Sequence, residues 1–130
     1  MLKEKRTSSI KVFENRILPM TIKEALKDGG LEAEVLLAYV LGCDREYLIG
    51  HGDEEAEIGL LKLFLKYMKE FQDGKPVAYI TKGKEFYGMD FFVDERVLIP
   101  RPETEMLVGE GLKYLMDRNL RKIKVLDVGT

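Results

Sequence analysis

Apolar and polar residues alternate along the first half of the chain with the spacing of amphipathic helices. Between residues 32 and 41 the apolar positions recur three and four residues apart, which places them on one face of a helix. A second, longer stripe runs from about 54 to 71. We expect these two helices to supply most of a small core. Their inward-facing positions are Ala33, Leu36, Leu37, Val40, Leu41, Leu60, Leu61, Phe64, Leu65, Met68 and Phe71.

The residues between the stripes predict where helices begin and end. Thr21 and Glu24 have the spacing of a capping box, so a short helix should run from there to Asp28 and stop at the two glycines that follow. Gly42 should close the next helix, and Asp44 can cap a brief third one. With the longer helix from about 54 to 71, four helices with such faces make a small bundle.

On either side of this bundle the periodicity changes. Upstream, weak spacing predicts only a frayed or peripheral helix around 9–15. Downstream, residues 77–81 are strand-like, and the apolar pairs in 85–87 and 91–93 flank residues 88–90 as a hairpin. We therefore expect a β element directly after the helical bundle.

The last thirty residues predict the start of an α/β unit. After two prolines, residues 103–119 regain helical spacing, and an apolar run from Ile123 then reaches Gly129. A terminal strand without a partner would leave its ladder groups unpaired, so we expect the chain to be the first part of a longer enzyme. The alternative is an ordinary edge strand at a natural C-terminus.

Composition narrows the class of protein. The 130 residues are 45% apolar and 34% charged, and no apolar run is long enough for a transmembrane helix or a signal peptide. Cys43 is the only cysteine, which excludes a disulfide framework and a thiolate metal cluster. The 21 basic and 23 acidic side chains are interspersed, which argues against binding nucleic acid through phosphates alone. We expect a cytoplasmic protein with no membrane partner, no metal site and no direct nucleic-acid binding.

Four segments stand in a distinctive order along the chain: residues 74–80, 85–88, 92–93 and 97–105. The most specific is the block Ile99-Pro100-Arg101-Pro102-Glu103-Thr104-Glu105; Asp127-Val128-Gly129 alone would be a weak signal. Together these segments resemble the peptide chain release factor glutamine methyltransferases. One position departs from the family pattern, because Lys82 stands directly after Tyr79-Ile80-Thr81, where a glycine is expected, and Gly83 comes one place later.

The resemblance implies an α+β fold in three parts. Residues 1–74 would form a helical substrate-recognition domain and residues 75–96 a β-hairpin linker. Residues 97–130 would be the first helix and strand of a truncated Rossmann-like methyltransferase domain. The complete enzyme, expected to be a monomer, would use S-adenosylmethionine to N5-methylate the glutamine of the Gly-Gly-Gln motif in translation release factors.

The same resemblance implies which residues lie near the cofactor. Gly129 would let the backbone approach the methionine and ribose of S-adenosylmethionine, since a Cβ there would block it. The family's Asn-Pro-Pro-Tyr motif, which grips the substrate amide, does not occur in the sequence, so we assign no catalytic residue and expect the chain alone to be inactive. The candidate cofactor-binding residues are Pro100, Arg101, Glu103, Thr104, Asp127, Gly129 and Thr130.

Simpler interpretations stand beside these. The prolines of the block stiffen an extended segment, and its charged residues can make surface ion pairs or favour a helix N-terminus. His51 could act as a base, although a lone histidine in a glycine-rich loop is usually just exposed. Two other functions remain open: a stand-alone helical interaction module, whose terminal strand pairs with another chain, and a related methyltransferase acting on a ribosomal protein or on adenine in nucleic acid.

Overall fold

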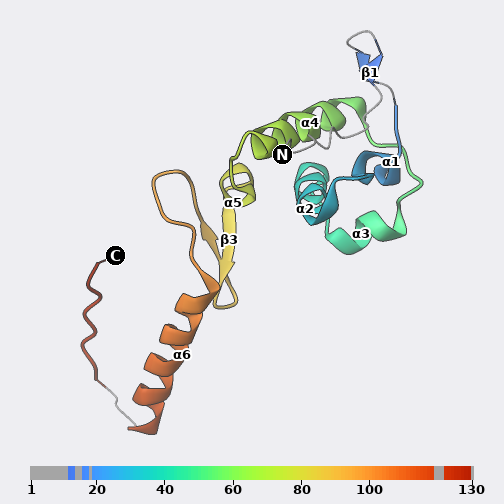
Figure 1. Ribbon diagram of the computed structural model, residues 1–130. Helices are drawn as coiled ribbons and strands as arrows, with labels where there is room; N and C mark the ends of the chain where they lie inside the picture. Colours follow the sequence, from blue (N-terminus) through green and yellow to red (C-terminus); the bar gives the residue numbers. More distant parts are fainter. Residues whose placement is uncertain (1–11, 14–15, 18, 119–121, 130) are drawn as a thin grey trace, which may run out of the picture. The chain divides into compact units, whose positions relative to one another are not determined.

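The computed structural model describes residues 12–13, 16–17, 19–118 and 122–129 (Figure 1). The chain divides into two compact units. The helical unit extends up to Lys82, and the hairpin unit begins at Gly83. Each unit is described by itself below.

The first helix of the helical unit begins with the predicted capping box. Helix α1 spans Ile22–Leu26, the Thr21 hydroxyl accepts a hydrogen bond from the Glu24 amide at 3.2 Å, and the Glu24 carboxylate accepts from the Thr21 amide at 3.0 Å. The expected end at Asp28 is wrong, because Lys27 already leaves the helical conformation and Asp28 has a φ of 66°. The next helix accordingly starts earlier than expected, at Gly30.

Helices α2, Gly30–Leu41, and α3, Arg45–Gly50, follow the predicted order. Gly42 closes α2 in the left-handed conformation, as expected. Asp44 is the N-cap residue of α3, although its side chain makes no capping hydrogen bond.

Helix α4 spans Ile58–Gln72, so the predicted start near residue 54 is wrong. Residues 54–56 pair instead with residues 20–22, at the start of α1. Glu54 O accepts from the Ile22 amide at 2.9 Å, and the Ala56 amide donates to Met20 O at 3.1 Å. Backbone pairing with a segment distant in sequence therefore overrides the local helical pattern.

Two further predictions fail in the helical unit. Residues Val77–Thr81 form helix α5 rather than a strand, because Val77 and Ile80, one turn apart, both pack on the core. Strands β1, Val12–Phe13, and β2, Arg16–Ile17, pair antiparallel where a helix was expected around 9–15. Residues 9–11 and 14–15 of that prediction lie outside the described residues.

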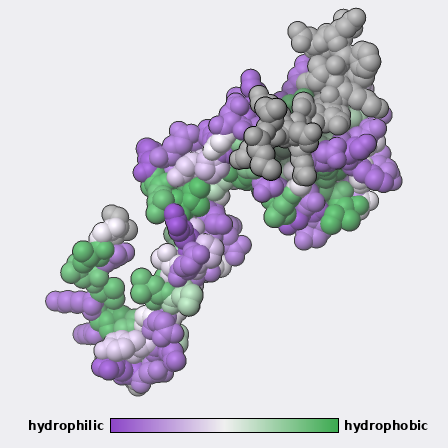
Figure 2. Space-filling view, in the orientation of Figure 1, coloured by the Kyte–Doolittle hydropathy of each residue, from purple (hydrophilic) through white to green (hydrophobic). Residues whose placement is uncertain are grey.

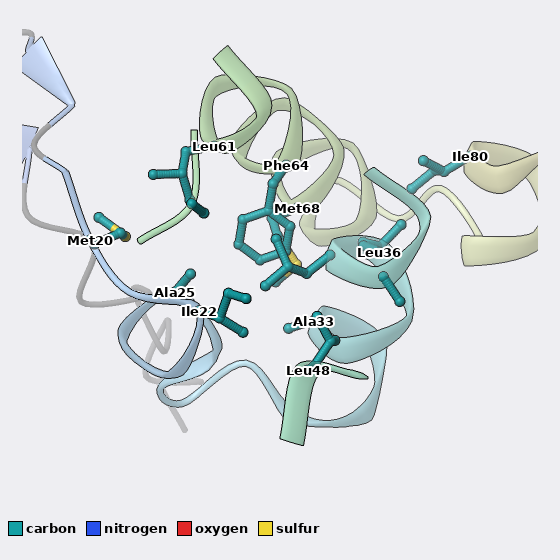
Figure 3. Packing of buried hydrophobic residues seen from close by; sticks show 13 residues of the cluster. Met20, Ile22, Ala25, Ala33, Leu36, Leu48, Leu61, Phe64, Met68 and Ile80 are labelled. Atoms are coloured by element: carbon teal, nitrogen blue, oxygen red, sulfur yellow. The ribbon is translucent and has the colours of Figure 1, made fainter. Parts of the chain in front are cut away.

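The core of the helical unit is formed by all five helices together with Met20 and Ala56 (Figure 3). Phe64, Leu36, Leu37 and Leu61 are its largest fully buried side chains, which confirms both predicted stripes except at Leu60, which is half-buried and not part of the cluster. Val40, Leu41, Leu65 and Phe71 pack against the cluster while partly exposed. The buried members of the cluster are Met20, Ile22, Ala25, Ala33, Leu36, Leu37, Ala38, Leu48, Ala56, Leu61, Phe64, Met68 and Ile80.

The hairpin unit contains an antiparallel pair and one long helix. Strand β3, Gly83–Phe86, pairs with β4, Met89–Phe92, so the turn consists of Tyr87 and Gly88 instead of the expected residues 88–90. Helix α6 spans Pro102–Asp117, close to the predicted range. Residues 122–129 form no strand, contrary to the prediction from Ile123 onward, because no strand in the described part of the chain lies beside them to complete a ladder. A mostly helical region, a hairpin and one further helix are thus confirmed.

Candidate functional site

The signature block, residues 99–105, comprises the end of the segment after strand β4 and the first turn of α6. Arg101 is the N-cap residue of α6, with extended backbone, and Pro102 takes the first helical position, where its missing N–H is harmless. The Thr104 amide donates to Arg101 O at 3.0 Å, which tightens this turn. Pro100 is half-buried, whereas Arg101, Glu103 and Thr104 are exposed. The polar groups predicted to lie near a cofactor are therefore accessible at a helix start.

Glu105 ties this helix start to the tip of the hairpin. Its Oε1 accepts a hydrogen bond from the Tyr87 amide at 2.9 Å, and Tyr87 and Gly88 both have positive φ, as a two-residue I′ turn requires. The Tyr87 hydroxyl also lies near Gly109, one turn further along α6, where an added Cβ would be 3.9 Å from it. From the sequence, Glu105 was expected only to make a surface ion pair or to favour the helix N-terminus. Its hydrogen bond to the hairpin turn was not predicted.

A second set of local hydrogen bonds lies just before the signature block. The Arg96 guanidinium donates to Asp94 Oδ2 at 2.6 Å and to Asp94 Oδ1 at 3.0 Å, and the Val97 amide donates to Asp94 O. The hydrogen bonds and charge of Asp94 hold the pKa of Arg96 above its ordinary value. The residues leading into the block therefore form a locally bonded turn, which the close Asp-x-Arg spacing could have indicated.

The other predicted cofactor residues lie in the extended segment after α6. Asp127 and Gly129 are exposed, and Gly129 has a φ of 90°, the kind of conformation that its assignment to a glycine turn needs. Thr130 lies outside the described residues. Among the described residues, no hydrogen bond or ion pair links residues 100–104 with 127–129, so their common site stays a prediction.

His51 is not the simple exposed residue that was expected. Its ring stacks on Tyr47 with centroids 3.7 Å apart, and its Nδ1 lies 2.9 Å from Tyr47 O. The Tyr47 hydroxyl donates to Glu54 at 3.3 Å, and the charge of Glu54 is the main reason that the pKa of Tyr47 is raised. These contacts give His51 a packing role at the end of α3.

Cys43 is a partly buried residue packed against the core. Burial, and to a lesser degree the charge of Asp44, raises the pKa of its thiol, so it lacks the depressed pKa of a nucleophilic cysteine. Within the described residues no group of three or more His, Cys, Asp and Glu side chains is arranged to hold a metal ion. None of the described helices combines the length and apolar character needed to cross a membrane.

An open pocket of about 720 Å³ lies on the helical unit, between α1 and α3. Leu26, Leu48 and Ile49 supply its apolar lining, and Lys23, Lys27 and Asp53 are among the charged residues around them. No sequence pattern pointed to this pocket, because its lining comes from α1, α2, α3 and the loop after α3, which only the fold brings together.

Comparison with known proteins gives the helical unit a family. The PrmC N-terminal domain matches residues 21–81, a range that begins at the N-cap of α1 and ends with the last residue of α5. A release factor glutamine methyltransferase of Chlorobaculum tepidum is 37% identical over 133 residues, covering 100% of this chain and 45% of that protein. The chain belongs to the release factor glutamine methyltransferase family. The resemblance found from the sequence is thereby confirmed.

Other relatives of the same name agree. The protein of Koribacter versatilis is 44% identical over 100 residues, or 77% of this chain and 35% of the relative. The protein of Clostridium acetobutylicum is 41% identical over 92 residues, or 71% of this chain and 32% of the relative. The chain thus spans a third to just under half of the length of these relatives. The activity of a whole enzyme therefore comes to this chain only as a proposal.

Proposed function

We propose that this chain is the N-terminal part of an S-adenosylmethionine-dependent methyltransferase that N5-methylates the glutamine of the Gly-Gly-Gln motif in translation release factors. The observation that carries the proposal is the match over the whole chain, at 37% identity, to a relative named a release factor glutamine methyltransferase. In this proposal residues 1–74 recognise the substrate, residues 75–96 link, and residues 97–130 begin a Rossmann-like domain. The enzyme would work in the cytoplasm as a monomer.

The reaction explains why the family needs residues beyond those in this sequence. An amide nitrogen is a poor nucleophile, so its lone pair must be aimed at the methyl group by hydrogen bonds from a preorganised site. The nitrogen gains the methyl group and loses a proton, and S-adenosylhomocysteine leaves. The sequence contains no Asn-Pro-Pro-Tyr segment to hold the amide, so the 130-residue chain alone should be inactive.

S-adenosylmethionine carries no phosphate, which suits a loop without clustered basic residues. Pro100, Arg101, Glu103 and Thr104 would form one wall of the cofactor site at the start of α6. Asp127, Gly129 and Thr130 would form the other, with Gly129 allowing close approach of the backbone. The exposure of Arg101, Glu103 and Thr104 and the positive φ of Gly129 support this assignment.

The decisive experiment uses the protein encoded by the whole gene. It is incubated with intact release factor and S-adenosylmethionine, and the Gly-Gly-Gln peptide is examined by mass spectrometry. We expect one added methyl group on the glutamine, and none with the 130-residue chain. Methylation of a ribosomal protein in place of the release factor would refute the proposed substrate, and methylation by the short chain would refute its inactivity.

A deletion tests the role of the helical part. Removing residues 1–72 from the whole enzyme should raise the Michaelis constant for intact release factor while sparing a short Gly-Gly-Gln peptide, because only the intact protein can occupy a second surface. If both substrates are affected equally, the helical part does not recognise the substrate.

A further inference from the structure

Residues 93–101 form the loop that connects strand β4 to helix α6 and leads into the polar part of the signature block. Burial does little to hold the middle of this loop, since Val97 is 49% and Leu98 is 77% exposed. Figure 2 shows hydrophobic atoms at the surface at the place that Figure 1 gives to the loop. The conformation of the loop is therefore set largely by what its two ends are bound to.

The two ends of the loop are held in different ways. At the start, Val93 is only 2% exposed, and the Asp94–Arg96 ion pair closes the turn that follows. At the end, Glu105 Oε1 accepts from the Tyr87 amide at 2.9 Å, which joins the first turn of α6 to the hairpin turn. Helix α6 buries none of its residues, so a single hydrogen bond contributes more to the position of its start than it would in a packed helix.

Tyr87 lies against α6 at two points one helical turn apart. Its amide donates to Glu105, and its hydroxyl lies near Gly109, where an added Cβ would be 3.9 Å away. Tyr87 has a φ of 51°, a left-handed conformation that is unfavourable for a residue with a Cβ and that asparagine or glycine usually adopts in such a turn. Backbone that its surroundings hold in an unfavourable conformation is concentrated at functional sites.

We propose that Glu105 is a positioning residue that holds the signature block in the conformation which binds S-adenosylmethionine. This inference rests on the proposed function, in which Pro100, Arg101, Glu103 and Thr104 form one wall of the cofactor site. Glu105 acts on that wall through the main chain. Its hydrogen bond to the hairpin turn fixes the first turn of α6, and with it the residues that come directly before Glu105.

The size of the expected effect follows from the population of the closed loop. When a ligand binds only one conformation, its apparent dissociation constant is the intrinsic constant divided by the fraction of protein in that conformation. Loss of one hydrogen bond of this kind lowers the ratio of closed to open loop about fivefold. The dissociation constant for S-adenosylmethionine should therefore rise about three- to fivefold in a variant that cannot close the loop.

Variants of the protein encoded by the whole gene separate the reach of this side chain from its charge. Glu105→Gln keeps an oxygen at the same distance from the main chain without the charge, whereas Glu105→Asp keeps the charge on a side chain one methylene shorter. In isothermal titration with S-adenosylmethionine, Glu105→Ala and Glu105→Asp should raise the dissociation constant about three- to fivefold. Glu105→Gln should stay within about twofold of the parent protein.

The matched control is Glu110→Ala, which removes the same charge from an exposed position further along α6. Its dissociation constant for S-adenosylmethionine should stay within about twofold of that of the parent, because a distant exposed charge is screened by water and salt.

A further readout separates positioning from a merely structural role. By linkage, S-adenosylmethionine should slow hydrogen exchange at the Tyr87 amide of the parent protein about three- to fivefold, and it should not do so in Glu105→Ala. In methylation assays, Glu105→Ala should raise the Michaelis constant for S-adenosylmethionine by a similar factor. Its kcat and its Michaelis constant for release factor should stay within about twofold of those of the parent.

These outcomes decide the inference separately from the proposed function. Affinity that is kept by Glu105→Asp and lost by Glu105→Gln would mean that the charge at the helix start matters and not the bond to the hairpin. Equal weakening by Glu110→Ala, equal affinity in all variants, or failure of the parent to bind S-adenosylmethionine would also overturn the inference. Methylation of a ribosomal protein in place of the release factor would refute the proposed substrate and leave these binding results unchanged.

Discussion

The helical unit and the hairpin unit differ most in what they bury. In the helical unit five helices enclose one cluster that includes Phe64, Leu36 and Leu37. In the described part of the hairpin unit only Val93 is buried, and helix α6 buries none of its residues. The first unit therefore has a core of its own, and the second does not.

The apolar residues of the hairpin unit are numerous but unpartnered. Leu107 and Met106 on α6 are each 73% exposed, and Leu126, in the segment after it, is 85% exposed. Exposed apolar side chains in such number are typical of a surface that another structure covers. The relative from Chlorobaculum tepidum is more than twice as long as the matched part, which agrees with the proposal that residues 97–130 begin a larger domain.

Shortening one large apolar side chain in each unit should give the largest difference between the two units. Phe64→Ala should lower the free energy of unfolding by about 3–5 kcal/mol, because it leaves a cavity in a closed core. Leu107→Ala should change it by about 0.5 kcal/mol or less, since that side chain is already in water. Urea titration followed by far-UV circular dichroism measures both. Similar losses in the two variants would mean that α6 has a core of its own.

Adding a methyl group to a glycine in each unit also tests whether the helical unit is closely packed and the hairpin unit is open. A Cβ at Gly29 would lie 2.3 Å from the Cβ of buried Ala33, so Gly29→Ala should destabilise the helical unit by about 1–3 kcal/mol. A Cβ at Gly111 on α6 meets nothing within 4 Å, and Gly111→Ala should stabilise the helix by up to about 1 kcal/mol. Thermal unfolding and helical content would reveal both effects. A loss of helix in the second variant would contradict the open face.

The sequence predicted the helical unit best where the information is local. Some features depend only on residues a few positions apart in the sequence, and these are confirmed. They are the apolar faces of α2 and α4, the Thr21–Glu24 capping box and the end of α2 at Gly42. Predictions failed where distant residues decide the conformation. The residues before α4 are bound to α1, and α5 is helical because Ile80 reaches the core, despite a strand-like composition.

The candidate site was predictable only in part, for the same reason. The signature block could be found from its residue types, and the structure places it at an exposed helix start. The tie between Glu105 and Tyr87 and the pocket between α1 and α3 depend on residues far apart in the chain. The predicted strand from Ile123 did not form, because a strand needs a neighbour that no local spacing supplies.

The loop closure by Glu105 should be visible at a single amide. Glu105→Ala removes the acceptor of the Tyr87 N–H, so protection of that amide from hydrogen exchange should fall about fivefold, equivalent to about 1 kcal/mol. Glu105→Gln keeps an oxygen at the same place and should retain most of the protection. Exchange followed by NMR gives the ratio. Equal protection in all three proteins would show that the hydrogen bond does not close the loop.

The smallest expected effect lies at the boundary of the two units. Lys82 stands where the resemblance led us to expect a glycine, and it adopts the left-handed conformation, with a φ of 58°, that ends α5. A left-handed backbone conformation costs a residue with a Cβ about 1–2 kcal/mol relative to glycine. Part of this advantage of glycine is offset, because glycine loses more conformational entropy on folding. Lys82→Gly should therefore raise the free energy of unfolding by about 0.5–1 kcal/mol. Lys84→Gly, in strand β3, makes the same change of side chain without a positive φ and should destabilise instead. A gain from Lys84→Gly equal to that from Lys82→Gly would mean that loss of the lysine, not relief of the backbone, is the cause.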